Sequence, residues 1–145
     1  MEQILYDLDG LIIGKSPFEG TQLEFTTVSE IGTSESPDRE RTFSAMLGLI
    51  MDELRMVRLG FRGSDVVTIA WDLDRSVGLS VVRVEGEVGF DSLTWINPMV
   101  RHCGLGTIMK AHALGRVVDA GATQLRANGD PSSSAFYRTL GLVPV

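Results

Sequence analysis

The chain reads Ile-Asn-Pro-Met-Val-Arg-His-Cys-Gly-Leu-Gly from Ile96 to Gly106, between an apolar, β-prone run (92–96) and a run of helical character (107–120). Glycines at a strand-to-helix turn let the backbone approach a ligand closely. The helix N-terminus adds unpaired N–H groups and the positive end of the helix dipole. Together these features predict an anion site, most often one for phosphate. The turn therefore indicates a phosphorylated cofactor.

The composition is typical of one globular domain, which we place over residues 1–145. Hydrophobic residues make up 43% of the chain, charged residues 22%, and the formal net charge is −6. An acidic chain argues against nucleic-acid binding, which requires a positive face. No apolar run approaches the ~20 residues of a membrane span, and the N-terminus lacks signal-peptide features. With Cys103 as the only cysteine, no internal disulfide and no metal site are expected. We therefore predict a cytoplasmic protein without a nucleic-acid or membrane partner.

The N-terminal half is predicted to contain three strands and a helix. Asp9-Gly10 is a hairpin turn signal between strands at 3–8 and 11–14, and a third strand follows at 21–28. Ser36 and Pro37 are typical of a helix start. We expect that helix to continue to near Gly60 because one apolar stripe has helical spacing. The stripe consists of Phe43, Leu47, Ile50, Leu54 and Val57.

The sequence of the C-terminal half predicts an antiparallel meander followed by alternating helices and strands. The meander strands are expected at 66–71, 77–84 and 88–96. A helix over 107–119 should end at Gly121, and a strand over 123–127 should run parallel to the strand that precedes the glycine turn. Ser132 or Ser133 is expected to cap a last helix that ends at Gly141, before a strand at 142–145. This order predicts an α+β fold with one central sheet.

Two motifs resemble the GNAT superfamily of N-acetyltransferases, which use acetyl-CoA. The first is a strand ending in apolar-x-Pro and then Arg-x-x-Gly-x-Gly, which here is Ile96, Pro98, Arg101, Gly104 and Gly106. The second, about thirty residues on, is Asp-Pro-Ser-Ser-Ser-Ala-Phe-Tyr over 130–137, followed by Leu-Gly-Leu over 140–142. The resemblance covers roughly 66–145, and the element order extends it to about residue 21. It implies a mixed, mostly antiparallel central sheet flanked by helices, with 1–20 as an N-terminal hairpin extension and 94–145 as the acetyl-CoA-binding half.

The resemblance also implies how acetyl-CoA is held. Its pyrophosphate would lie on the backbone N–H groups of the 101–107 turn. Its pantetheine would slot between two splayed parallel strands by β-like hydrogen bonds, at 94–97 and 126–128. Asp130 stands where the family usually has asparagine, and Asn128 is the nearby amide. The expected cofactor contacts are Trp95, Ile96, Asn97, Arg101, His102, Cys103, Gly104, Leu105, Gly106, Thr107, Asn128, Ser132, Ser133 and Tyr137.

Three residues are catalytic candidates by the same resemblance. Tyr137 matches the family tyrosine that donates a proton to the leaving CoA thiolate, and a phenol suits that role. Family members often place a base glutamate eleven residues before the arginine, where this chain has Phe90. Asp91 is adjacent, but strand alternation sends it to the other face unless a bulge intervenes. Glu87 lies at the preceding turn, and an ordered water is a further alternative.

Three functions follow as hypotheses. The first is transfer of an acetyl group from acetyl-CoA to a primary amine of a small molecule, peptide or protein, by direct attack in a ternary complex. The second is a non-catalytic, regulatory acyl-CoA-binding module. The third is a magnesium-dependent phosphohydrolase, because residues 4–13 resemble the first motif of the haloacid-dehalogenase-like family with Asp7 and Asp9 as its acidic pair. An Asp-Gly turn explains that run more simply.

The C-terminal end of the sheet raises a further question, because GNAT proteins usually finish with one or two more strands after the position of Gly141. The exposed strand edge must then be covered. Either the N-terminal hairpin (3–14) occupies that edge, or a partner subunit covers it in a homodimer.

Overall fold

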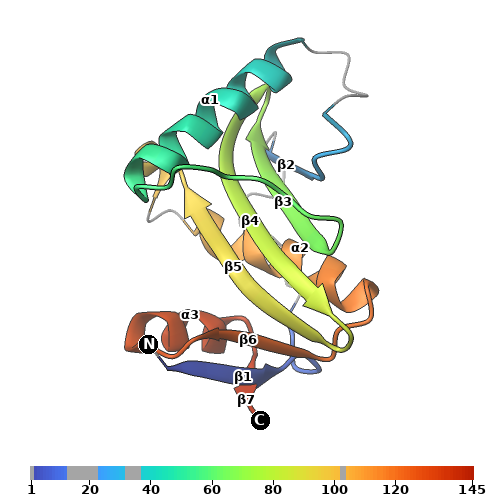
Figure 1. Cartoon of the computed structure of the whole chain (residues 1–145). Coiled ribbons are helices and arrows are strands. Elements are labelled where there is room, and N and C mark those ends of the chain that lie inside the picture. Colours follow the sequence, from blue (N-terminus) through green and yellow to red (C-terminus); the bar gives the residue numbers. More distant parts are fainter. Residues whose placement is uncertain (1, 13–22, 32–36, 102–103) are drawn as a thin grey trace.

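A seven-stranded sheet forms the centre of the protein in the computed structural model, which describes residues 2–12, 23–31, 37–101 and 104–145 (Figure 1). The strand order is β2-β3-β4-β5-β6-β1-β7. Among the described residues, β5 and β6 are the only parallel neighbours, so the predicted mixed, mostly antiparallel sheet is confirmed. The strands are β1 (Gln3–Asp7), β2 (Leu23–Thr26), β3 (Asp65–Asp72), β4 (Arg75–Glu85), β5 (Val88–Ile96), β6 (Gln124–Asn128) and β7 (Val143–Pro144).

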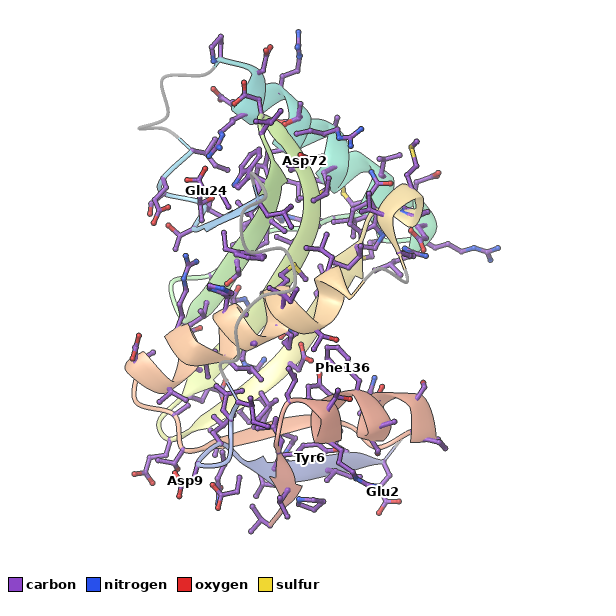
Figure 2. The ribbon with its side chains drawn as sticks, turned by 180° about the vertical axis from the view of Figure 1, so that it is seen from behind. Glu2, Tyr6, Asp9, Glu24, Asp72 and Phe136 are labelled. Atoms are coloured by element: carbon purple, nitrogen blue, oxygen red, sulfur yellow. The ribbon has the colours of Figure 1, made fainter. Side chains whose placement is uncertain are left out.

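Helices cover both faces of this sheet (Figures 1 and 2). On one face, Phe43, Met46 and Ile50 of α1 pack against β3 and β4. On the other face, Leu114 of α2 and Tyr137 of α3 share a core with β1, β4 and β6. None of the helices in the described ranges is long and apolar enough to cross a membrane. The helices are α1 (Pro37–Glu53), α2 (Leu105–Asp119), α3 (Pro131–Thr139) and the short 3₁₀ helix η1 (Pro98–Val100).

The N-terminal strand β1 lies inside the sheet, between β6 and β7. It pairs with β6 along its whole length. The prediction that the N-terminal segment covers the exposed strand edge at the C-terminal end of the sheet is therefore confirmed for β1. The predicted hairpin is wrong, because Leu11 and Ile12 belong to no strand; residues 13–14 lie outside the described residues. Tyr6 and Leu8 are only 2% and 3% exposed. β6 therefore takes one edge of β1 along its whole length, and β7 takes the other edge at Tyr6 and Asp7.

Helix α1 ends at Glu53, earlier than the apolar stripe predicted. Arg55 has a φ of 53° and donates its N–H to the Asp52 carbonyl, while the Met56 N–H donates to the Met51 carbonyl. These two bonds form the Schellman motif, which usually has glycine in the left-handed position. The sequence did not indicate that the helix ends here, because arginine and not glycine occupies the left-handed position. Two residues of the predicted stripe are consequently exposed, Leu54 at 45% and Val57 at 101%.

The Asp9-Gly10 turn is present, and it brings the chain against the end of α3. Asp7 Oδ1 accepts a hydrogen bond from the Asp9 N–H at 2.9 Å, as is usual for aspartate at the start of a turn. A Cβ on Gly10 would collide with the carbonyl oxygen of Gly141. Close contact between two backbone segments therefore explains this glycine, and Asp7 acts as a turn residue.

We predict that Gly141→Ala destabilises the protein by at least about 1–2 kcal/mol, because Gly141 has a φ of +84° and an added Cβ would meet the Gly10 carbonyl oxygen. Gly48→Ala is the matched control: Gly48 lies within α1 with open space around it, so alanine should stabilise the helix by about 0.5–1 kcal/mol. Urea unfolding measures both changes. Equal midpoints for Gly141→Ala and the unmodified protein would contradict the close contact.

Candidate functional site

Strands β5 and β6 separate after a short parallel contact, and a cavity opens between them. They pair only over Val88–Phe90 and Gln124–Arg126; beyond this the strands diverge, and the last residues of β6 stay paired with β1 (Figure 1). The cavity has a volume of about 340 Å³. Figure 2 shows Phe136 of α3 directed into the space between α3 and α2. The cavity is lined by Asp91, Ser92, Leu93 and Thr94 of β5, Asn128 of β6, and Ser132, Ser133, Phe136 and Tyr137 of α3.

A β-bulge at Ser92 decides which way the β5 side chains face. Val81 of β4 is opposite Leu93, and the next residue, Val82, is opposite Asp91, so Ser92 is the extra residue. Leu93 packs in the α1-side core. Asp91 instead faces α2, where it contacts a lysine of that helix. The bulge follows Asp91 and does not separate it from Phe90, which is opposite Arg83 while Asp91 is opposite Val82. The two side chains therefore lie on opposite faces, as strand alternation predicted, and the Asp91 carboxylate faces the α2 side of the cavity.

Asp91 forms a buried ion pair with Lys110 of α2. The Nζ of Lys110 is 3.0 Å from Asp91 Oδ1 and donates to Ser80 Oγ at 2.7 Å. The lysine side chain is 0% exposed and the aspartate side chain 8%. Complete burial lowers the pKa of Lys110, and the charge and hydrogen bond of Asp91 oppose that shift. Buried ion pairs in proteins can often be replaced by apolar side chains without loss of stability, so the burial of this pair is weak evidence for a stabilising role.

The glycine turn leads into α2 through Gly104. This residue is the N-cap, has a φ of 87°, and makes no side-chain capping bond. The helix starts at Leu105, two residues before the predicted start at Thr107. The N–H groups of its first turn have no partner within the helix, so they can donate to an anion. His102 and Cys103, two predicted cofactor contacts, lie outside the described residues.

Arg101 joins the turn to the end of α1. Its guanidinium donates to both carboxylate oxygens of Glu53, at 2.8 and 3.0 Å, and its Nε donates to the Ile96 carbonyl at 2.7 Å. The indole Nε1 of Trp95 also donates to Glu53, at 2.7 Å. The hydrogen bonds from Trp95 and then from Arg101 lower the pKa of Glu53. Arg101 and Trp95 therefore direct their polar groups toward α1.

Two further predicted contacts lie at the end of β5. Asn97 donates its N–H to the Val77 carbonyl at 2.8 Å, and its side-chain oxygen accepts the Met99 N–H at 3.0 Å. Asn97 thereby caps η1. Gly106 lies against Ile96, where an added Cβ would be 3.6 Å from the isoleucine side chain. The structure thus brings Ile96 and Gly106 together but uses the Asn97 side chain to hold the turn.

The cap of α3 is Asp130, so the prediction of a serine cap is wrong. Its carboxylate accepts the Ser133 N–H at 2.9 Å and hydrogen bonds from the hydroxyls of Ser132 and Ser133, each at 2.8 Å. These bonds, the backbone bond first, lower the pKa of Asp130. Aspartate is among the best N-cap residues, which explains why it outcompetes the following serines. Both serines still line the cavity, together with Asn128.

The catalytic candidates differ in their placement. Tyr137 lines the cavity from α3, is 5% exposed, and packs against Tyr6 with ring centroids 5.3 Å apart. Asp91 also lines the cavity. Glu87 is exposed in the β4–β5 turn, does not line this cavity, and accepts the N–H groups of 123 and 124 with its backbone carbonyl. The structure therefore brings Tyr137 and Asp91 to one cavity and leaves Glu87 away from it.

Two charged residues near the site were not found from the sequence. Lys110 occupies an otherwise apolar helix face, and a lysine inside such a stripe is the one signal that could have marked it. Glu53 has no such signal, because its partners Trp95 and Arg101 are more than forty positions away in the chain. Long-range contacts of this kind depend on the fold.

Comparison with known proteins shows which solved structures have a similar fold. No protein-family model and no curated protein match the chain. A GCN5-related N-acetyltransferase structure from Kribbella flavida has a TM-score of 0.64 at 15% identity, and the alignment covers 98% of this chain and 53% of that one. Glucosamine-6-phosphate N-acetyltransferase from Arabidopsis thaliana has a TM-score of 0.59 at 14% identity, covering 84% and 92%. An aminoglycoside acetyltransferase from an uncultured soil metagenomic sample, in complex with sisomicin, has a TM-score of 0.57 at 11% identity, covering 85% and 89%.

The protein has the fold of the GCN5-related N-acetyltransferases, as the two sequence motifs implied. At these identities the likeness concerns the fold. The chain spans about half the length of the Kribbella flavida structure, at 53%, and 47% of a structure from Sphaerobacter thermophilus.

We predict that Lys110 makes the stability of the protein rise with pH in the alkaline range. Its pKa in the folded state is lowered from 10.5, so between that lowered pKa and 10.5 the unfolded chain binds more protons than the folded one. The free energy of unfolding therefore increases as pH rises through this window. Urea unfolding from neutral pH to 10.5 should show the increase relative to Lys110→Met.

The matched control is the double variant Lys110→Met/Asp91→Leu. The single variant leaves the Asp91 carboxylate buried without its partner, which should cost about 3–5 kcal/mol. The double variant removes both charges and should recover most of that loss. A single variant as stable as the double would show that the two side chains are not energetically coupled.

Proposed function

We propose that the chain binds acetyl-CoA and transfers its acetyl group to a primary amine. The observation that carries this proposal is the separation of β5 from β6, with a cavity between them and, after β5, the N-terminus of α2, whose N-cap Gly104 makes no side-chain capping bond. The names of two structures with the same fold are consistent with it: one is a glucosamine-6-phosphate N-acetyltransferase and the other an aminoglycoside acetyltransferase.

The residues at this site suit the chemistry of acetyl-CoA. A pantetheine arm carries amides, which can bond to a strand edge, and Asp91–Ile96 of β5 have no partner strand on the β6 side among the described residues. A pyrophosphate requires several N–H donors, and the first turn of α2 from Leu105 to Thr107 offers them. Arg101 is paired with Glu53, so we assign phosphate binding to the backbone and not to that guanidinium.

The two sides of β5 provide a path for direct transfer. A second cavity, of about 310 Å³, lies on the α1 side and shares Ser92 and Leu93 with the first. An amine held in the second cavity would reach the bulge from the side opposite to the cofactor. When bound, acetyl-CoA supplies an activated thioester, and holding both reactants at the bulge would provide much of the rate by proximity. The phenol of Tyr137 would donate a proton to the departing thiolate.

Neither predicted base is well placed to take the proton from the amine. The Asp91 carboxylate is bonded to Lys110 and faces α2, and Glu87 lies in an exposed turn. We therefore assign proton removal to solvent at the bulge. The same observation favours the alternative of an acyl-CoA-binding module without turnover. The phosphohydrolase hypothesis has no such support: Asp7 is bonded within a turn, and no group of three potential metal-binding side chains occurs in the described part of the chain.

Calorimetric titration with acetyl-CoA, with free CoA beside it, tests the cofactor site. Saturable binding supports the proposal, and release of CoA thiol with a panel of primary amines then identifies an enzyme. Binding without thiol release supports the binding module. A folded protein that binds neither compound contradicts both functions.

We predict that Tyr137→Phe lowers kcat at least about 100-fold while acetyl-CoA binding is unchanged, because only the acidic proton is lost. Tyr6→Phe is the matched control: its ring packs against Tyr137, but it does not line the cavity, so its kcat should stay near that of the unmodified protein. Thiol release under saturating substrate measures both. Similar kcat values for the two variants would remove Tyr137 from the mechanism.

A further inference from the structure

A row of three side chains crosses the α1 face of the sheet at the closed end of the β5–β6 separation. In the strand registers, Arg83 of β4 is opposite Phe90 of β5, and Phe90 is opposite Arg126 of β6. The two guanidinium carbons lie 4.7 and 5.7 Å from the centre of the phenyl ring, within cation–π range. We call these three residues the arginine row.

The arginine row adjoins the second cavity, the one on the α1 side of β5. Arg83 lines this cavity together with Arg62, which lies in the segment entering β3. Ser92 and Leu93 line the same cavity and also the cofactor-side cavity. The two arginines therefore share one pocket with the bulge at which the proposed reaction takes place.

The positive charge around this cavity is only partly neutralised. Neither Arg62 nor Arg126 forms an ion pair with a carboxylate of the described residues. Arg83 Nε is 2.9 Å from Glu85 Oε1, but that carboxylate is 57% exposed, and exposed pairs bind weakly. Asp65 also lines the cavity, and its carboxylate accepts the backbone N–H of Arg62 at 2.7 Å. The residues that line the cavity thus carry two guanidinium groups and one carboxylate.

We propose that the acceptor is an amine that also carries an anionic group, a carboxylate or a phosphate, and that Arg62 and Arg83 bind that group in the α1-side cavity. This inference rests on the proposed function and names the substrate class. Guanidinium groups match carboxylate and phosphate oxygens with paired hydrogen bonds. They repel an ammonium group, so a bound anionic amine would direct its nitrogen away from the arginines and toward Ser92.

The test is equilibrium binding in the presence of free CoA, which cannot acetylate the probes. Two pairs of probes differ only in the anionic group: O-phosphoethanolamine with ethanolamine, and β-alanine with β-alaninamide. We expect the charged member of at least one pair to bind at least about tenfold more tightly than its neutral counterpart, since hydrogen bonds to charged groups are worth that much. The pair that shows the difference identifies phosphate or carboxylate.

Variants show whether the arginines cause the preference. Arg83→Gln and Arg62→Gln should each remove most of it, whereas Arg75→Gln, at the far end of β4 and 57% exposed, should keep it. Arg83→Lys retains the charge without the planar fork and should be intermediate. Circular dichroism of each variant checks its fold. Equal binding within both probe pairs, or an unchanged preference in Arg83→Gln and Arg62→Gln, would overturn the proposal.

Failure of the anion site and failure of the proposed acetyl transfer give different results. An anion preference that depends on Arg62 and Arg83, in a protein that shows no acetyl transfer, would support the anion site and contradict the proposed function. Acetyl transfer to neutral and anionic amines with the same KM would support the proposed function and contradict the anion site.

Discussion

The site depends on how the backbone hydrogen bonds of β6 are satisfied. Successive residues of a strand direct their N–H and C=O groups to opposite edges, so a strand paired at one edge can stay in the sheet while groups at its other edge are free for a ligand. β6 pairs with β5 over only three residues, but it pairs with β1 along its whole length. β1 therefore lets β6 diverge from β5 while remaining part of the sheet. The cavity, the wall that α3 contributes to it, and the position of Tyr137 all follow from this arrangement, since Tyr6 of β1 supports the Tyr137 ring.

The bulge at Ser92 gives the two faces of β5 different chemistry. On the α2 side, Asp91 and Lys110 neutralise each other in a buried pair beside the proposed cofactor cavity. On the α1 side, Phe90 lies between two arginines whose charge is less fully matched. A regular strand would alternate without interruption and could not turn both Leu93 and Phe90 to the α1 side while sending Asp91 to the other. One inserted residue thus places a buried ion pair on one face of β5 and two arginines around a phenyl ring on the other.

Much of the fold could be predicted from the sequence because its signals are local. The meander, the strand-to-helix glycine turn and the helix stops at Gly121 and Gly141 each depend on residues within a few positions of one another. The early end of α1 could not be predicted, because Arg55 takes the left-handed position where glycine is usual. The serine cap was wrong for a related reason, since Asp130 competes for the same N–H group. Local patterns fail where an uncommon residue takes a position, as Arg55 does, and where neighbouring residues are equally suited to one role, as Asp130 and the serines after it are.

For the site, the sequence by itself determined which residues stand at the glycine turn and on the last helix, and so the resemblance to acetyl-CoA enzymes. Tertiary structure alone decided that Asp91 meets Lys110, that Arg101 meets Glu53, and that β1 enters the sheet beside β6. The physical reason is the range of the interactions. Turns and caps form between neighbours in the chain, whereas ion pairs and strand registers join segments whose separation is set only when the whole core has packed.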